Sequence, residues 1–418
     1  MTSTPPPPTP EFSLVLLGGD IGIYAIARAF HEQYGTHATA VTRQVAGPIA
    51  DSRFIETVEL GKDADDDRIV EALLEVGARA SRGGTRPVIL LANADWLVAL
   101  MSAHRDRLGA HYVLPILAEQ TLRDVSDKAT FSEICAAIDV ETPETVVLDF
   151  RGEGPTVIPE LSFDFPVVAK AASSSAYSRV SFPGKRKVFE IASAAALSDL
   201  VGRLDAAGFQ DRFVVQEMIP GDDTAMRSIT AFVDSRGEVT LLGGAHVLLE
   251  EHTPGALGNP AAMFTTSLPD IEEQAVRFLQ HTGYRGYANF DVKVDPRTGV
   301  AKFFEVNPRI GRNNYYMTAA GANIARVVVA DAVEDRPIER LVPDREVLYS
   351  IVPRSLLWRY ILDPVLKHRV RQIGKRSTVH PLLYRGEGLK RRGYVLAAMA
   401  NQVRKFLRHY PKPSYDGF

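Results

Sequence analysis

The chain has 418 residues, a formal net charge of −3, and a globular composition with 45% hydrophobic and 24% charged residues. This length suits about two or three domains with a sizeable core. The single cysteine, Cys135, excludes an intrachain disulfide and Cys-based zinc motifs. No apolar run approaches the roughly 20 residues that a membrane-spanning helix needs. We therefore expect a cytoplasmic protein.

The N-terminal part predicts a leader followed by a nucleotide-binding type of fold. Residues 1–12, MTSTPPPPTPEF, are proline-rich and predict a disordered leader. In residues 13–120, buried strands alternate with helices, which predicts a Rossmann-like, doubly wound parallel sheet. The turn Gly18–Gly22 follows the first strand but lacks the full G-x-G-x-x-G spacing. It is therefore a structural turn, a small-molecule substrate site, or an NAD or FAD site.

Two lysines mark the next region. SDKATFSEIC places Lys128 at the start of an amphipathic helix, and FPVVAK places Lys170 at the end of an apolar strand. A run of small residues follows, including Ser173, Ser174 and Ser175. Such a flexible turn lets backbone N–H groups and a lysine close over phosphates. Taken alone, Lys170 is better explained as a solvated lysine at a strand end.

A second apolar strand, RFVV, is interrupted at Gln216 and Glu217 and turns after Met218 and Ile219. A short linker with a free backbone donor and acceptor, flanked by apolar side chains, suits an adenine ring. The acids just beyond it, Asp222 or Asp223, are then within reach of ribose hydroxyls. The alternative interpretation is a strand edge with exposed acids.

The segment YANFDVKVDPRTGVAKFFEVN predicts a β-hairpin around DPRTG, with Gly299 at a position of positive φ. Pairing of Val294 with Val300 puts three polar residues on one face, because strand side chains alternate. Those residues are Asp291, Glu305 and Asn307. The opposite, core face then holds Phe290, Val292, Phe304 and Val306.

Two carboxylates on a partly buried face repel each other unless a cation lies between them. A set of oxygen ligands without His or Cys favours a hard divalent metal. The hairpin therefore predicts a magnesium site, with manganese as the alternative.

The C-terminal part is basic. From residue 351 onward there are 15 Lys and Arg against three acids. The same region carries bulky apolar residues, as in YVLAAMANQVRKFLRHY, which predicts amphipathic helices. These helices either pack on the protein with a solvated basic face or contact an anionic partner, which is a membrane surface or a polyphosphate substrate. We expect no nucleic acid partner.

The Asp…Glu-x-Asn-x-Arg arrangement of Asp291, Glu305, Asn307 and Arg309, with the two lysines and the linker, resembles the ATP-grasp superfamily of carboxylate–amine ligases. The resemblance covers about residues 120–335 and implies an α/β protein with four parts. These are a leader (1–12), a Rossmann-like domain (13–120), a two-lobed α+β ATP-grasp unit (121–340, mobile lobe about 165–220) and a basic helical C-terminal segment (345–418). NPRIGRNNYYMTAAGAN looks most like the amino-acid ligases, such as D-aspartate ligases that extend a peptidoglycan precursor.

The resemblance also implies roles for individual residues. ATP is the cofactor, with two magnesium ions held by Asp291 with Glu305 and by Glu305 with Asn307. Arg309 is implied as the group that holds the carboxylate and the oxyanion, and Arg312 is a second candidate. The implied ATP contacts are Lys128, Lys170, Ser173, Ser174 and Ser175 at the phosphates, Gln216, Glu217, Met218 and Ile219 at the adenine, and Asp223 at the ribose. Arg227, His246 and His252 either touch substrate or pack.

The expected function is ATP-dependent ligation of a carboxylate to an amine through an acyl phosphate. Its partners are an amino acid and an amine- or carboxylate-bearing acceptor. The alternatives are a dinucleotide-dependent oxidoreductase and a non-catalytic nucleotide- or anion-binding protein. A homodimer is the common oligomeric state, and a membrane-binding C-terminal segment predicts peripheral attachment at the inner membrane face.

Overall fold

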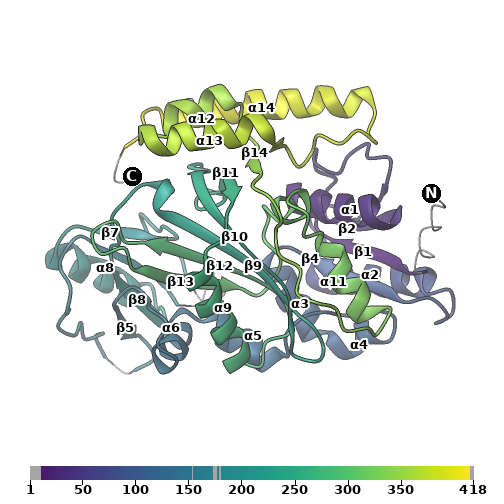
Figure 1. Ribbon diagram of the computed structural model, residues 1–418. Coiled ribbons are helices and arrows are strands. Elements are labelled where there is room, and N and C mark those ends of the chain that lie inside the picture. The colour runs from purple at the N-terminus through teal and green to yellow at the C-terminus, as the bar shows by residue number, and fades with distance from the viewer. Residues whose placement is uncertain (1–10, 153, 173–176, 178–179, 415–418) are drawn as a thin grey trace.

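A computed structural model describes residues 11–152, 154–172, 177 and 180–414 (Figure 1). The described residues form three sheets, of four, seven and four strands. The predicted α/β fold class is confirmed. Most of the predicted leader, residues 1–10, lies outside the described residues. Phe12, which the sequence assigned to that leader, is buried and packs edge-on against Phe30 and Tyr34.

The N-terminal sheet is parallel and has the strand order β3-β2-β1-β4. Asp20 caps the helix that follows the first strand, by accepting hydrogen bonds from the backbone N–H groups of Gly22 and Ile23. Its strands are β1 (Ser13–Leu17), β2 (Ala38–Thr42), β3 (Ile55–Glu59) and β4 (Val88–Ala92), and its helices are α1 (Ile21–Tyr34), α2 (Asp66–Ala80), α3 (Asp95–Ala103) and α4 (Arg105–Gly109). The predicted Rossmann-like alternation is therefore present.

A small antiparallel sheet with its own apolar core forms a separate lobe. Helix α6 contacts two of its strands, β5 and β8. The elements in and beside this lobe are α5 (Glu119–Ser126), α6 (Lys128–Ala137), β5 (Thr145–Asp149), β6 (Val167–Ala171), β7 (Phe189–Ile191), α8 (Ala194–Ala206) and β8 (Arg212–Glu217). The order of the strands is β5-β8-β6-β7.

The seven-stranded sheet is the centre of the molecule and has the order β13-β12-β9-β10-β11-β14-β15. Helices α10 and α11 contact α1, so the N-terminal sheet and the central sheet share one apolar core. The elements are η1 (Asp223–Ala225), β9 (Met226–Val233), β10 (Val239–Glu250), β11 (Pro260–Thr265), α9 (Pro269–His281), β12 (Gly286–Val294), β13 (Ala301–Asn307), α10 (Tyr315–Ala319), α11 (Ile324–Ala332), β14 (Leu348–Ser350) and β15 (Thr378–Val379). Two of these strands, β14 and β15, come from the basic C-terminal segment.

The remaining C-terminal residues form a helical layer along one side of the molecule, at the top of Figure 1. It consists of α12 (Arg354–Tyr360), α13 (Pro364–Arg376) and α14 (Leu389–His409). Arg391 of α14 donates hydrogen bonds to the carbonyls of Gly47, Pro48 and Ala50. Glu387 accepts one from the buried hydroxyl of Tyr24. The C-terminal segment thus contacts the loop after β2 and helix α1 of the N-terminal part, and α12 and α13 contact the central sheet.

The predicted hairpin is present, but its predicted register is wrong. Val294 pairs with Ala301 rather than with Val300, and a β-bulge between Val292 and Asp291 leaves Phe304 without a cross-strand partner. Phe303, rather than Phe304, is therefore the buried core residue. Alternation alone could not locate the bulge, because its extra residue shifts the phase of every later position.

Candidate active site

The centre of the site is a pair of carboxylates. Beyond the bulge Asp291 pairs directly with Glu305, so the two acids are cross-strand neighbours on β12 and β13. Burial, and then the charge of Glu305, raise the pKa of Asp291 above its ordinary value. Burial would also raise the pKa of Glu305, but the charges of Lys128 and Lys170 outweigh it and lower that pKa. The pair is therefore ionised unequally, with the negative charge held beside the lysines.

Asn307 and Arg309 continue the same strand end. The amide nitrogen of Asn307 donates to Oδ2 of Asp291 at 2.9 Å, and its oxygen accepts from Arg309 at 2.8 Å. Arg309 also pairs with Asp95 at the start of α3, at 3.0 Å. The structure thus brings Asp291, Glu305, Asn307 and Arg309 together at one end of the hairpin.

Lys128 reaches this site from the first turn of α6. Asp127 caps the helix and also pairs with Arg212 on β8 at 2.6 Å, which fixes where the helix begins. The ammonium of Lys128 then lies 3.2 Å from Oε2 of Glu305.

Lys170 approaches from β6 in the small lobe. Burial, and then the charge of Lys128, lower the pKa of Lys170 to about 8. Its ammonium lies 5.9 Å from the centre of the Phe304 ring, which the bulge turns toward the site. Two lysines from different elements therefore converge on the carboxylate pair. The predicted lid residues Ser173, Ser174 and Ser175 lie outside the described residues.

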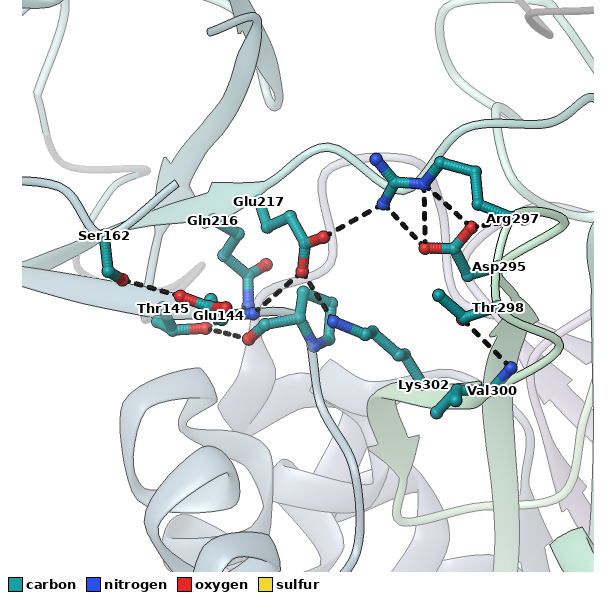
Figure 2. Close-up of polar contacts among 11 residues, drawn as sticks. Glu144, Thr145, Ser162, Gln216, Glu217, Asp295, Arg297, Thr298, Val300 and Lys302 are labelled. Atoms are coloured by element: carbon teal, nitrogen blue, oxygen red, sulfur yellow. Dashed lines mark hydrogen bonds and ion pairs between the residues drawn. The ribbon is translucent and has the colours of Figure 1, made fainter. Parts of the chain in front are cut away.

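The predicted adenine linker begins at the end of β8, where Glu217 joins the small lobe to the hairpin (Figure 2). Glu217 accepts from Lys302 at 2.6 Å and pairs with Arg297 at 3.2 Å. Burial alone would raise its pKa, but the hydrogen bond and charge of Lys302 bring the pKa below its ordinary value. Gln216 is buried and donates to Thr145 on β5. Both side chains are engaged in protein contacts, and the backbone N–H of Glu217 also donates to the carbonyl of Glu144 at 2.8 Å.

The two apolar residues of the linker differ in exposure. Ile219 is buried, and Met218 is only partly buried. The predicted ribose contact, Asp223, is buried and accepts from the backbone N–H of Glu250 at 2.9 Å and from His252 at 3.0 Å. His252 in turn stacks on Tyr410, with ring centres 3.7 Å apart. The structure therefore ties Asp223 to the C-terminal segment.

Arg227 and His246 make protein contacts. Arg227 donates to the carbonyls of Thr224 and Met226, and the His246 ring bonds to the Thr224 carbonyl at 2.7 Å. Burial lowers the pKa of His246 to about 3. These contacts favour the packing interpretation for both residues.

A cavity of about 30 Å³ lies beside the carboxylate pair. Its walls are rich in amide and guanidinium groups. It is lined by Gly258, Asn259, Pro260, Asn289, Asp291, Asn307, Arg309, Arg312, Asn313 and Tyr349. Asp291 is its one acidic wall residue among the described ones, so the cavity suits an anionic or carbonyl-bearing group. Tyr349 comes from β14, and no motif in the sequence indicated it.

Arg312 is held from two sides. Its Nε lies 3.1 Å from Asp20, and its Nη1 lies 2.6 Å from Glu251, whose side chain is 2% exposed. A Cβ added at Gly22 would lie 2.9 Å from the Arg312 Cα, so only glycine permits this close approach. The N-terminal glycine turn therefore packs against Arg312.

This packing bears on the dinucleotide interpretation of the turn. Asp20 already accepts from the N–H groups of Gly22 and Ile23, which a pyrophosphate would need. These contacts argue against the dinucleotide reading of the glycine turn. The sequence did not predict a role for Asp20 or Glu251, because both pair with the distant Arg312. Asp20 is 292 residues away from it along the chain, and Glu251 is 61 residues away.

Comparison with known proteins gives the family. No family model matches the chain. A D-aspartate ligase from Enterococcus faecium (strain Aus0004) is 31% identical over 379 residues, which cover 88% of this chain and 89% of the relative. The chain belongs to the D-aspartate ligase family. The sequence-based resemblance is confirmed.

Solved structures give the same fold. An L-amino acid ligase from Bacillus licheniformis superposes with a TM-score of 0.57 at 15% identity, covering 82% of this chain and 80% of that one. The biotin carboxylase domain of the Hydrogenobacter thermophilus 2-oxoglutarate carboxylase, solved with MgADP, has a TM-score of 0.57 at 17% identity, with coverage of 81% and 74%. An N5-carboxyaminoimidazole ribonucleotide synthetase, solved with ADP, has a TM-score of 0.55 at 13% identity, with coverage of 87% and 85%. The protein is an ATP-grasp ligase.

Proposed function

We propose that this D-aspartate ligase relative joins the carboxylate of one substrate to the amine of another through an acyl phosphate. The observation that carries the proposal is the cross-strand pair Asp291–Glu305, with Lys128 3.2 Å from Glu305 and Lys170 beside it. Acids and lysines in this arrangement suit a nucleotide phosphate with its metal. The domain limits predicted from the sequence, with a lobe of about residues 165–220 closing over ATP, are part of the proposal.

The donor set fits magnesium. Asp291 and Glu305 offer carboxylate oxygens, and Asn307 offers an amide oxygen after its amide turns away from Arg309. Among the residues that the structure describes, no group of three or more His, Cys, Asp or Glu side chains could hold a metal alone. Phosphate oxygens and water would therefore complete the coordination. Bound magnesium, or manganese in its place, would neutralise charge on the transferring phosphoryl group, and the proposal uses two ions.

The protein side chains would hold ATP by its two ends. Lys128 and Lys170 would contact the phosphates, with Ser173, Ser174 and Ser175 as the proposed lid. The backbone from Gln216 to Ile219 would bind the adenine. Glu217 cannot swing freely, because Lys302 and Arg297 hold it, so the linker is preorganised. Asp223 is the proposed ribose neighbour.

Arg309 and Arg312 would bind the carboxylate to be activated and then stabilise the oxyanion that forms when the amine attacks. Both line the cavity next to Asp291. Each is paired with an acid of the N-terminal domain, Asp95 and Asp20, whose side chains are 59% and 41% exposed. A substrate carboxylate can replace these exposed partners without leaving a buried charge unpaired.

We propose an amino acid as the carboxylate substrate and D-aspartate as the first to test, because the curated relative is a D-aspartate ligase. Two guanidinium groups at one cavity suit a substrate with two carboxylates. The proposed acceptor is an amine-bearing peptidoglycan precursor. A cytoplasmic location, a homodimer and contact of the C-terminal segment with the inner membrane face complete the proposal.

Transfer of an oxygen atom tests the acyl phosphate. When the substrate carboxylate is labelled with ¹⁸O, one labelled oxygen should appear in the released phosphate, because that oxygen attacks the γ-phosphorus of ATP. Mass spectrometry of the phosphate measures this. Label in AMP, or unlabelled phosphate together with labelled amide product, would contradict the mechanism.

A further inference from the structure

The long C-terminal helix α14 has an outer face that the described residues leave open. Leu389, Leu396 and Leu407 on this face are 81%, 66% and 50% exposed. The face that packs lies about 100° around the helix from these leucines and carries the buried side chains of Val395 and Phe406. The helix lies at the outer edge of the molecule (Figure 1) and has one apolar surface in the core and a second one exposed.

The three exposed leucines form a straight stripe. Their spacings are 7 and 11 residues, so at about 100° per residue they lie within about 20° of one another around the helix. The exposed Ala400 falls in the same sector. The stripe runs for about 27 Å, at 1.5 Å per residue. Isolated exposed leucines are ordinary on protein surfaces, but an aligned row of them is not.

Cations flank the stripe on both sides. Arg392 lies about 60° to one side of it, and Arg404 and Arg408 lie about 60° and 100° to the other. All three are exposed, and none makes an ion pair with the described part of the chain. The helix Leu389–His409 contains no acidic residue. The neighbouring helix α13, in the same outer layer of Figure 1, also contains none.

We propose that the face of α14 formed by Leu389, Leu396, Ala400 and Leu407, with Arg392, Arg404 and Arg408 at its edges, docks on an anionic lipid bilayer. A helix with a leucine centre and cationic flanks lies in the plane of a membrane interface, where its leucines enter the acyl boundary and its cations reach the headgroups. The described residues contain no helix long and apolar enough to cross a membrane. The contact is therefore peripheral.

The order of the side chains favours a bilayer over other occupants. A second copy of this face would bring arginines against arginines, and like charges repel. A nucleic acid or a free polyphosphate would be bound by cations at the centre of the face, whereas here leucines occupy the centre. Charge attracts the protein to the surface, and the leucines provide the part of the binding that salt does not screen.

Co-sedimentation with vesicles tests the proposal without ATP or substrate, so its failure would leave the proposed ligase activity untouched. Vesicles of phosphatidylcholine with phosphatidylglycerol are compared with vesicles of phosphatidylcholine alone. The test variants are Leu396→Ser with Leu407→Ser, and Arg392→Gln with Arg404→Gln and Arg408→Gln. Because all these side chains are exposed, the variants should unfold at the wild-type temperature.

Matched controls change the same chemistry elsewhere on the surface. Val157→Ser with Val342→Ser removes two apolar groups that are 80% and 54% exposed. A second control removes three exposed cations from the helices α4, α9 and α11, by the substitutions Arg107→Gln, Arg277→Gln and Arg326→Gln. Both controls should bind vesicles as the wild type does, since neither touches α14.

We expect binding to the anionic vesicles only. The leucine variant should weaken it at least tenfold, and each arginine removed should weaken it about fivefold at low salt. Absence of wild-type binding at low salt would overturn the proposal. So would binding that the arginine variant loses but the leucine variant keeps, because the contact would then be a purely electrostatic one without insertion. Equal binding to neutral vesicles would also contradict it.

Discussion

Replacing Asp291 by asparagine should stabilise the metal-free protein while removing its response to magnesium and ATP. Asp291 and Glu305 are directly opposed across two strands, a geometry that brings side chains to about 5.5 Å. At an effective dielectric constant of about 20, two like charges at that distance repel by about 3 kcal/mol. Lys128, 3.2 Å from Glu305, offsets part of this repulsion. The free energy of unfolding of the metal-free variant should therefore exceed that of the wild type by about 1 to 3 kcal/mol.

The stability gained by Asp291→Asn should depend on pH. The pKa of Asp291 is raised in the folded protein by burial and by Glu305. The folded state therefore holds a proton that the unfolded state has lost, and stability falls as the pH rises from about 4 through the raised pKa. Asp291→Asn removes this loss, so its benefit should be largest near pH 8 and vanish near pH 4.

Thermal unfolding in EDTA, and then with magnesium and a non-hydrolysable ATP analogue, measures both effects. With an unfolding entropy of about 2.1 cal/mol/K per residue, the expected gain corresponds to about 1 to 3 °C in EDTA at pH 8. Wild type should gain further stability from magnesium with the analogue, and the variant should not. A variant that is less stable than wild type in EDTA at pH 8, or that keeps the magnesium-dependent shift, would refute the reasoning.

Three further substitutions probe the neighbouring contacts. Glu305→Gln should keep the fold and lose magnesium-dependent ADP formation, and retained turnover would remove Glu305 from the proposed metal site. Lys170, with a pKa of about 8, should take up a proton when ATP binds above pH 8, as calorimetry in buffers of different ionisation enthalpy detects; Lys170→Met should abolish that uptake. Lys302→Met should cost about 1 to 2 kcal/mol and weaken ATP binding, because it frees Glu217 from a mostly buried contact. Arg123→Met, in an exposed pair, is its control and should cost under about 0.5 kcal/mol.

Much of the site could be predicted from sequence because its residues lie on local patterns. Asp127 and Lys128 begin a helix as a cap and its first residue, and Gly299 takes the positive φ of the hairpin turn. Asp291 and Glu305 share a face as expected. They do so for a different reason: the register next to the turn differs from the predicted one by one residue, and the bulge at Phe304 adds a second, so the two acids return to the same face.

The contacts missed by sequence analysis are those that join distant segments. Arg312 meets Asp20 and Glu251 across the fold, and Tyr349 reaches the cavity from a strand in the basic segment. No periodicity or spacing encodes such meetings, because they depend on how the sheets pack. The basic segment likewise showed its amphipathic character in sequence, but not that two of its strands belong to the central sheet.

The central claim is that ATP cleavage by this protein forms an amide bond. The most direct measurement incubates the purified protein with magnesium, ATP, D-aspartate and pools of amine-bearing acceptors, and counts ADP and new amide together by mass spectrometry. We predict one ADP and one phosphate per amide, with neither formed when the carboxylate or the amine is left out. ADP release that needs no amine, or AMP and pyrophosphate in place of ADP, would contradict the claim.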